Sequence, residues 1–75
     1  MKPLFVSRHA FLRVRQREIS LEDVKKVLQR PDLLVSAKHG RLKAIKRYSD
    51  RELVVIYKRA RHMYIVVTAY WREKC

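Results

Sequence analysis

The sequence is poor in cysteine, glycine and acidic side chains, and each shortage excludes a class of site. Cys75 is the only cysteine, so we expect neither a disulfide framework nor a cysteine-based metal site. Gly40 is the only glycine, which leaves no glycine-rich loop to bind phosphate. The seven Asp and Glu residues are too few and too scattered for a two-metal nuclease. The sequence therefore predicts no metal and no cofactor.

Long hydrophobic runs are missing as well. No segment approaches the length of a membrane span, and the apolar run near the N-terminus is too short for a signal peptide. A lone cysteine also suits a reducing compartment. We therefore expect a cytoplasmic protein with no membrane partner. The 75 residues, 48% of them hydrophobic, predict one domain over residues 1–75 with a marginal core.

Positive charge is abundant. The chain has 19 Lys and Arg against seven Asp and Glu, which gives a formal net charge of +12. Residues 1–17 and residues 33–49 contain basic side chains and no acid. Such self-repulsion is usually tolerated because a polyanion neutralises it, and nucleic acid is the favoured partner. A thermophile-like charged surface is the alternative, but it would raise glutamate along with lysine.

The first part of the chain predicts two helices. Ser7 is an N-cap candidate before residues 8–18, which carry apolar side chains on one face. Ser20 opens a second helix over residues 20–30, with an apolar stripe of its own. Pro31 ends it.

In the remainder of the chain, apolar and polar residues alternate as they do in β-strands. Residues 41–48, 52–59 and 62–71 read as three strands joined by short turns, which makes their pairing antiparallel. Residues 4–6 and 33–37 are candidates for further short strands. The predicted fold class is α+β, with two N-terminal helices packed on one face of a three- to four-stranded antiparallel sheet.

The alternation assigns different side chains to the two sheet faces. One register places apolar residues against the helices, namely Leu42, Ala44, Val54, Ile56, Met63, Ile65, Val67, Ala69 and Trp71. The opposite, open face then carries Arg41, Lys43, Arg47, Tyr57, Arg59, Tyr64, Thr68, Tyr70 and Arg72. Lys46 falls on the core side, which requires either a bulge or a lysine stem that reaches an edge.

An open face that is both basic and aromatic suits single-stranded nucleic acid. Cations neutralise phosphates, and tyrosine rings stack on unpaired bases. The alternative is an ordinary solvated face whose tyrosines pack across strands.

Cleavage of RNA without metal needs a base for the ribose 2′-OH, cations for the developing charge and an acid for the leaving oxygen. His9 is the strongest acid/base candidate, because Arg13 lies one helical turn away and Arg17 borders the same polar face. The alternative is that His9 only packs at the helix start. Tyrosine is a further proton donor, but the sequence does not choose among Tyr57, Tyr64 and Tyr70. His39 and His62 fall in or beside turns and are expected to be solvated.

Three motifs carry a family resemblance. They are Ser7-Arg8-His9-Ala10 with Arg13, Arg17 and Ile19-Ser20; then Val24, Val27-Leu28 and Pro31; and finally Val54-Val55-Ile56-Tyr57 with Ile65-Val66-Val67-Thr68-Ala69-Tyr70. With these motifs the chain resembles a family of small uncharacterised domains, domain of unknown function 4258. That family is in turn similar to the RelE/ParE/BrnT toxins of type II toxin–antitoxin pairs.

The resemblance implies a RelE-like fold, a cognate antitoxin as partner, and cleavage of messenger RNA, often on the ribosome, by basic residues of the open face. The residues that could match this pattern are Lys43, Arg47, Arg59, Tyr70 and Arg72. The chain departs from RelE in one respect, since only residues 72–75 follow the last strand where RelE has a C-terminal helix or tail. ParE-like members share the fold but inhibit gyrase, so the fold alone does not determine the activity.

Our leading hypothesis is a toxin-like, metal-independent ribonuclease of the mRNA interferase type. The expected catalytic residues are His9, Arg13, Arg47 and Tyr70. The expected nucleic-acid-binding residues are Arg8, Arg17, Arg41, Lys43, Lys46, Tyr57, Arg59, Tyr64 and Arg72. The alternatives are a non-catalytic RNA- or DNA-binding module and a ParE-type protein inhibitor, and formation of a homodimer is left open.

Overall fold

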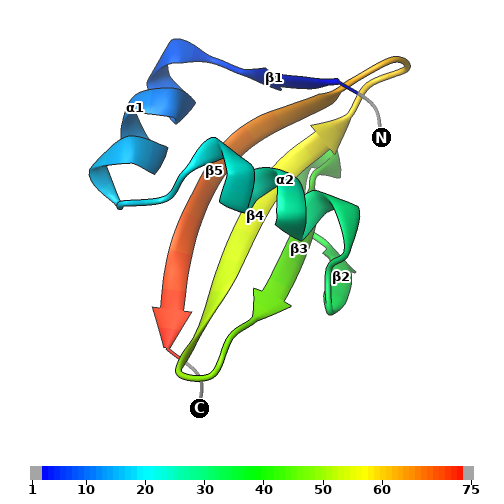
Figure 1. Ribbon diagram of the computed structural model, residues 1–75. Helices are drawn as coiled ribbons and strands as arrows, with labels where there is room; N and C mark the ends of the chain where they lie inside the picture. The colour runs from blue at the N-terminus through cyan, green and yellow to red at the C-terminus, as the bar shows by residue number, and fades with distance from the viewer. Residues whose placement is uncertain (1–2, 74–75) are drawn as a thin grey trace.

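A computed structural model describes residues 3–73 of the chain. Within these residues the elements follow the order β1 (Leu4–Val6), α1 (Arg8–Gln16), α2 (Leu21–Gln29), β2 (Leu33–Ser36), β3 (Leu42–Arg47), β4 (Arg51–Arg59) and β5 (Tyr64–Glu73), with a 3₁₀ turn at Lys38–Gly40. Figure 1 shows that α1 and α2 lie on the same face of the sheet. Helix α1 packs against β5, and α2 packs against β4 and β3.

The described strands form one sheet in the order β1-β5-β4-β3-β2. Strand β1 runs parallel to β5, whereas all other neighbours are antiparallel. The predicted α+β class with two helices is confirmed. The prediction of three to four antiparallel strands is wrong, because the sheet is five-stranded and mixed. Parallel pairing needs a long connection, which the chain between Val6 and Tyr64 supplies.

Both helices begin at the predicted serine caps. The Ser7 hydroxyl accepts a hydrogen bond from the Ala10 N–H at 3.2 Å. Ser20 and Asp23 form a capping box, in which each side chain accepts from the other residue's backbone N–H. These bonds satisfy N–H groups that the first helical turn leaves without partners. Helix α1 ends at Gln16, slightly earlier than predicted, and Glu18 takes a left-handed conformation with φ 58°.

The hydrophobic core lies between the helices and one face of the sheet. Its buried members are Val14, Ile19, Val24, Val27, Ala44, Leu53, Val55, Tyr57, Val66 and Ala69, and Trp71 packs against them. The expected placement of Ala44, Ala69 and Trp71 on this side is confirmed. In β4, however, the helix-facing residues are Leu53 and Val55 and not Val54 and Ile56. Alternation could not decide between the registers, since residues 53–56 are apolar at every position.

Tyr57 faces the core because it alternates in phase with Leu53 and Val55, and a β-bulge brings Tyr64 to the same side. The pairing of β4 with β5 shifts between Ile56 and Tyr57, so that Ile56 pairs with Thr68 but Tyr57 pairs with Val66. Val67 is the extra residue, so the side chains of β5 that precede it alternate between the two sheet faces in the opposite order from those that follow it. Tyr57 is 4% exposed in the core, and its ring meets that of Tyr64 edge-on at 5.3 Å between centroids. The expectation that both tyrosines lie on the open face is therefore wrong.

Lys46 lies on the helix side of β3, paired in register with the core residue Leu53. Its Nζ reaches the carbonyl oxygen of Arg30 at 3.4 Å, at the C-terminal end of α2. This confirms the second of the two sequence alternatives, a half-buried stem with its ammonium at the edge. The cation also complements the negative end of the helix dipole.

The burial of Leu53 yields a stability prediction. Leu53→Ala removes a fully buried side chain from the centre of the core, and the resulting cavity should lower the free energy of unfolding by about 2–5 kcal/mol. Urea denaturation followed by circular dichroism measures this loss. Leu12→Ala, at a half-exposed position on α1, is the control and should change stability by less than about 0.5 kcal/mol. Equal losses in the two variants would contradict the assignment of the core.

Candidate nucleic-acid interface

One row of charged side chains crosses three strands on the open face of the sheet, the face opposite α1 and α2. In the strand register, Glu52 of β4 lies between Arg47 of β3 and Arg72 of β5. Its carboxylate accepts from Arg47 Nε at 3.1 Å, and from Arg72 Nε at 3.1 Å and Nη2 at 2.8 Å. One carboxylate therefore fixes two guanidinium groups.

The acid and the two arginines of this row differ in their exposure to solvent. The side chain of Glu52 is only 11% exposed, whereas those of Arg47 and Arg72 are 52% and 43% exposed. The hydrogen bonds from Arg72, and then those from Arg47, lower the pKa of Glu52 against the opposing effect of its burial. The ionised carboxylate holds the two arginines, whose side chains stay about half exposed. The row presents net positive charge in a fixed geometry.

A hollow of about 710 Å³ lies beside this row on the same face. Its lining residues are Ser36, Ala37, Lys38, His39, Arg41, Lys43, Ile56 and Tyr70. The hollow thus brings together three predicted site residues, Arg41, Lys43 and Tyr70, with a histidine. Its lining also includes the apolar residues Ala37 and Ile56. A lining that combines apolar side chains with cations can receive an unpaired base and its phosphate.

The turn at residues 38–40 shapes one wall of the hollow. His39 has φ 62° and ψ 36°, a left-handed conformation that is uncommon outside glycine. Gly40 follows with φ 71°, and the two residues reverse the chain so that it can enter β3. The Nε of Arg41 is buried and hydrogen-bonds to no residue within the described part of the chain. A buried donor of this kind favours a ligand that brings an acceptor oxygen.

The predicted helical residues form a separate surface. Arg8, His9 and Arg13 line a second hollow, of about 500 Å³, with Leu12 and Gln16 on the exposed side of α1. His9 and Arg13 therefore lie together as predicted. Arg47 and Tyr70 belong to the open face, so the four expected catalytic residues are divided between two surfaces.

Arg17 connects these regions structurally. Its Nη1 donates to the Thr68 hydroxyl at 3.1 Å and to the Ala69 carbonyl at 2.9 Å. Both acceptors belong to β5 beyond Val66, where the pairing with β1 has ended. Arg17 therefore ties the end of α1 to the outer edge of β5.

The remaining predicted residues lie away from the open face. Tyr57 and Tyr64 are on the core side, and Lys46 is engaged at the end of α2. Arg59 is exposed at the opposite end of β4 from Glu52, and its pairing with Tyr64 places it on the helix side of the sheet. The expectation that Arg59 lies on the open face is therefore wrong.

Sequence reasoning missed two members of the site, Glu52 and His39. Glu52 could have been found from the hairpin, because the Tyr48 N–H donates to the Arg51 carbonyl and this short turn places Arg47 opposite Glu52. His39 was assigned to a solvated turn. Its position at the same hollow as Tyr70 depends on how the turn folds over the sheet, and no local pattern encodes that placement.

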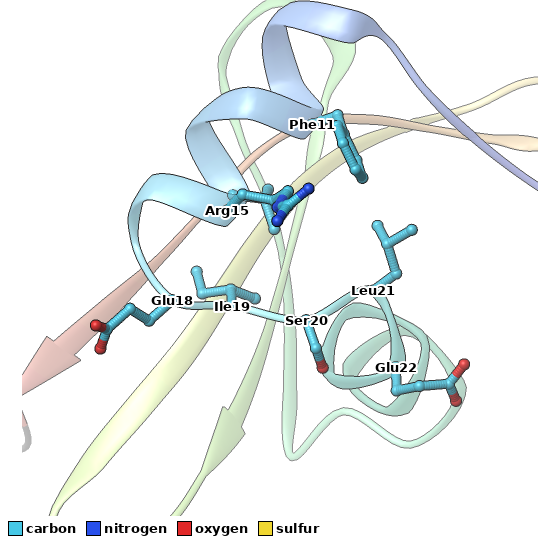
Figure 2. Close-up of a pocket in the computed structure, with 8 residues that line it drawn as sticks. Phe11, Arg15, Glu18, Ile19, Ser20, Leu21 and Glu22 are labelled. Carbon is cyan, nitrogen blue, oxygen red and sulfur yellow. The ribbon is translucent and has the colours of Figure 1, made fainter.

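A further hollow, of about 480 Å³, lies between the helices and has a different character. Figure 2 shows Phe11 and Leu21 pointing toward each other across it, while the carboxylates of Glu18 and Glu22 point outward. None of the predicted site residues lines it. We therefore place the candidate site on the open face.

Two classes of feature are missing from residues 3–73. No group of three or more His, Cys, Asp or Glu side chains in this range is arranged to hold a metal ion. No helix in the same range is long and apolar enough to span a membrane.

The ion-pair row predicts a pH-dependent stability. Because the pKa of folded Glu52 is lowered, its contribution is complete above the ordinary glutamate pKa of about 4.3 and is lost as the pH falls through the lowered value. Glu52→Gln should therefore be less stable than the wild type at neutral pH. The difference should shrink in acid, as measured by urea denaturation between about pH 7 and pH 2.

Glu22→Gln provides the matched control. Glu22 lies on an exposed helix surface and forms an exposed ion pair with Lys25 at 3.5 Å, so its replacement should have little effect at any pH. A Glu52→Gln difference that stays constant from neutral pH into acid would contradict the assigned role of the row.

Comparison with known proteins identifies a family. Residues 6–71 match the family described as domain of unknown function DUF4258, and the chain therefore belongs to that family. The searches of curated proteins and of solved structures found no match.

Proposed function

We propose that this member of the DUF4258 family binds single-stranded RNA on the open face of its sheet and cleaves it without a metal ion. One observation carries the proposal, namely the hollow that brings His39, Arg41, Lys43 and Tyr70 together. Metal-independent phosphodiester cleavage requires a base, an acid and cations, and these four side chains could supply those groups around one volume.

Binding rests on the arrangement of charge and apolar surface. Arg41 and Lys43 at the hollow, with Arg47 and Arg72 beside it, offer cations to successive phosphates. Tyr70 offers a ring on which an unpaired base can stack, and Ile56 offers apolar surface beside it. Flexible single strands can follow such a face, whereas the side chains of a sheet cannot read the deep groove of an RNA duplex.

The cleavage step uses the substrate's own 2′-hydroxyl. His39 takes the 2′-OH proton, the 2′ oxygen forms a bond to phosphorus, and the bond from phosphorus to the 5′ oxygen breaks. Tyr70 gives a proton to the departing 5′ oxygen. The products are a 2′,3′-cyclic phosphate and a 5′-hydroxyl. Arg41 and Lys43 stabilise the charge that develops on the phosphate oxygens.

The resemblance to RelE/ParE/BrnT toxins supports a biological setting for this activity. We place the chain in the cytoplasm as the toxin of a toxin–antitoxin pair, with messenger RNA as the substrate. The net charge of +12 supports a polyanionic substrate. The separation of His9 and Arg13 from the hollow favours His39 as the proton acceptor.

Cleavage of a single-stranded RNA oligonucleotide in the presence of EDTA tests the proposal. His39→Ala and Tyr70→Phe should each lower the cleavage rate by about 10²–10⁴-fold, because each removes one proton-transfer group. His62→Ala is the matched control, since His62 is exposed in the turn before β5, and it should cleave at the wild-type rate.

Two other outcomes would change the proposed activity or the proposed site. RNA that binds in a salt-dependent manner and stays intact would identify a non-catalytic RNA-binding module and contradict the cleavage step. Loss of cleavage in His9→Ala, with retention in His39→Ala, would move the site to the surface of α1.

A further inference from the structure

Strand β2 is an apolar edge. It is the outermost strand of the described sheet, paired with β3 on one side. All four of its residues are exposed, and Leu33, Leu34 and Val35 are large hydrophobic side chains. Figure 1 shows this short strand at the border of the sheet, beside the end of α2. Three consecutive exposed aliphatic residues on an edge strand are costly in water and prone to association.

The backbone of β2 has hydrogen-bonding groups available on its outer side. The Ala37 N–H donates to the Arg41 carbonyl at 2.9 Å, in the same register that pairs Val35 with Lys43. Because backbone groups alternate along an antiparallel pair, Leu33 and Val35 face β3. The N–H and C=O groups of Leu34 and Ser36 then point away from the sheet.

The two edges of the sheet differ in how they are protected from the addition of another strand. On the β5 side, β1 covers residues 64–66, and the Arg17 guanidinium binds the edge beyond them. On the β2 side, residues 33–36 include no charged residue and no proline, which are the usual means of blocking strand addition. The outer side of β2 is therefore ready to accept another strand.

The charges around β2 indicate which side chains an added strand would carry. Lys38 follows β2 directly, and Lys43 lies opposite Val35. Asp32, the acid that precedes β2, already accepts a hydrogen bond from the Arg47 N–H at 2.7 Å. A second copy of the chain would bring a further net charge of +12 to this edge. An acidic segment would neutralise the lysines.

We propose that β2 binds an extended acidic segment of a partner protein as an additional strand. The main chain of the segment bonds to the outward N–H and C=O groups of Leu34 and Ser36. Its apolar side chains, at alternate positions, lie beside Leu34 on the helix side of the sheet. Its carboxylates lie on the open face, where Lys43 pairs with Val35, and reach toward Lys43 and Lys38. The edge shares Lys38 and Lys43 with the hollow, but strand addition does not require RNA cleavage, so either proposal can fail without the other.

The probe is a fluorescently labelled peptide of about ten residues that alternates Val and Glu, titrated with the full chain at physiological salt. Leu34→Glu should weaken binding by about tenfold or more, because it places like charge at the edge. Leu12→Glu is the matched control. It changes the net charge equally at a similarly exposed leucine, 50% against 45%, and should bind as the wild type does. Circular dichroism verifies that both variants fold.

Changes in the peptide separate strand pairing from charge attraction. N-methylation of consecutive central residues removes the backbone donors from both peptide edges and should abolish binding. Replacement of Glu by Lys should also abolish binding. Equal affinity for the N-methylated peptide, or equal weakening by Leu34→Glu and Leu12→Glu, would overturn the proposal. A dimer of the chain alone that Leu34→Glu dissociates would overturn it too, because a second copy would then occupy the edge.

Discussion

The register of β4 between β3 and β5 is the constraint on which the rest of the structure depends. It turns Leu53 and Val55 toward the helices, where they close the core. The same register places Glu52 between two arginines on the opposite face. A shift of one residue would exchange the faces, bury the carboxylate under the helices and expose the core leucine. Core and candidate site are therefore two consequences of one set of strand pairings.

The same pairings distribute the excess charge. Glu52 neutralises part of one row, but no acid occurs between residues 33 and 49, which supply Arg41 and Lys43 to the hollow and Lys38 to its wall. A core as small as this one tolerates such repulsion only because the side chains lie on the surface, where water screens them. The repulsion persists in the free protein, so any bound polyanion gains from relieving it.

Local patterns predicted the elements better than their arrangement. Serine caps and apolar stripes define both helices, since these features act within a few residues. The face of β4 was not predictable, because residues 53–56 are apolar throughout and a bulge beside Tyr57 changes the phase of β5. The parallel position of β1 and the contact of His39 with the hollow depend on residues distant in the sequence. Lys43 and Tyr70 were placed correctly on the open face because simple alternation holds in β3 and in the part of β5 that follows the bulge.

The RNA face and the β2 edge share part of their surface. Ser36 ends β2 and also lines the hollow, as do Lys38 and Lys43. An acidic strand on β2 would place carboxylates next to the same lysines that phosphates require. Two anionic ligands on one cationic surface repel each other, so each lowers the affinity of the other by the same factor. A partner protein bound at β2 would therefore weaken RNA binding without entering the hollow, by competing for its charge.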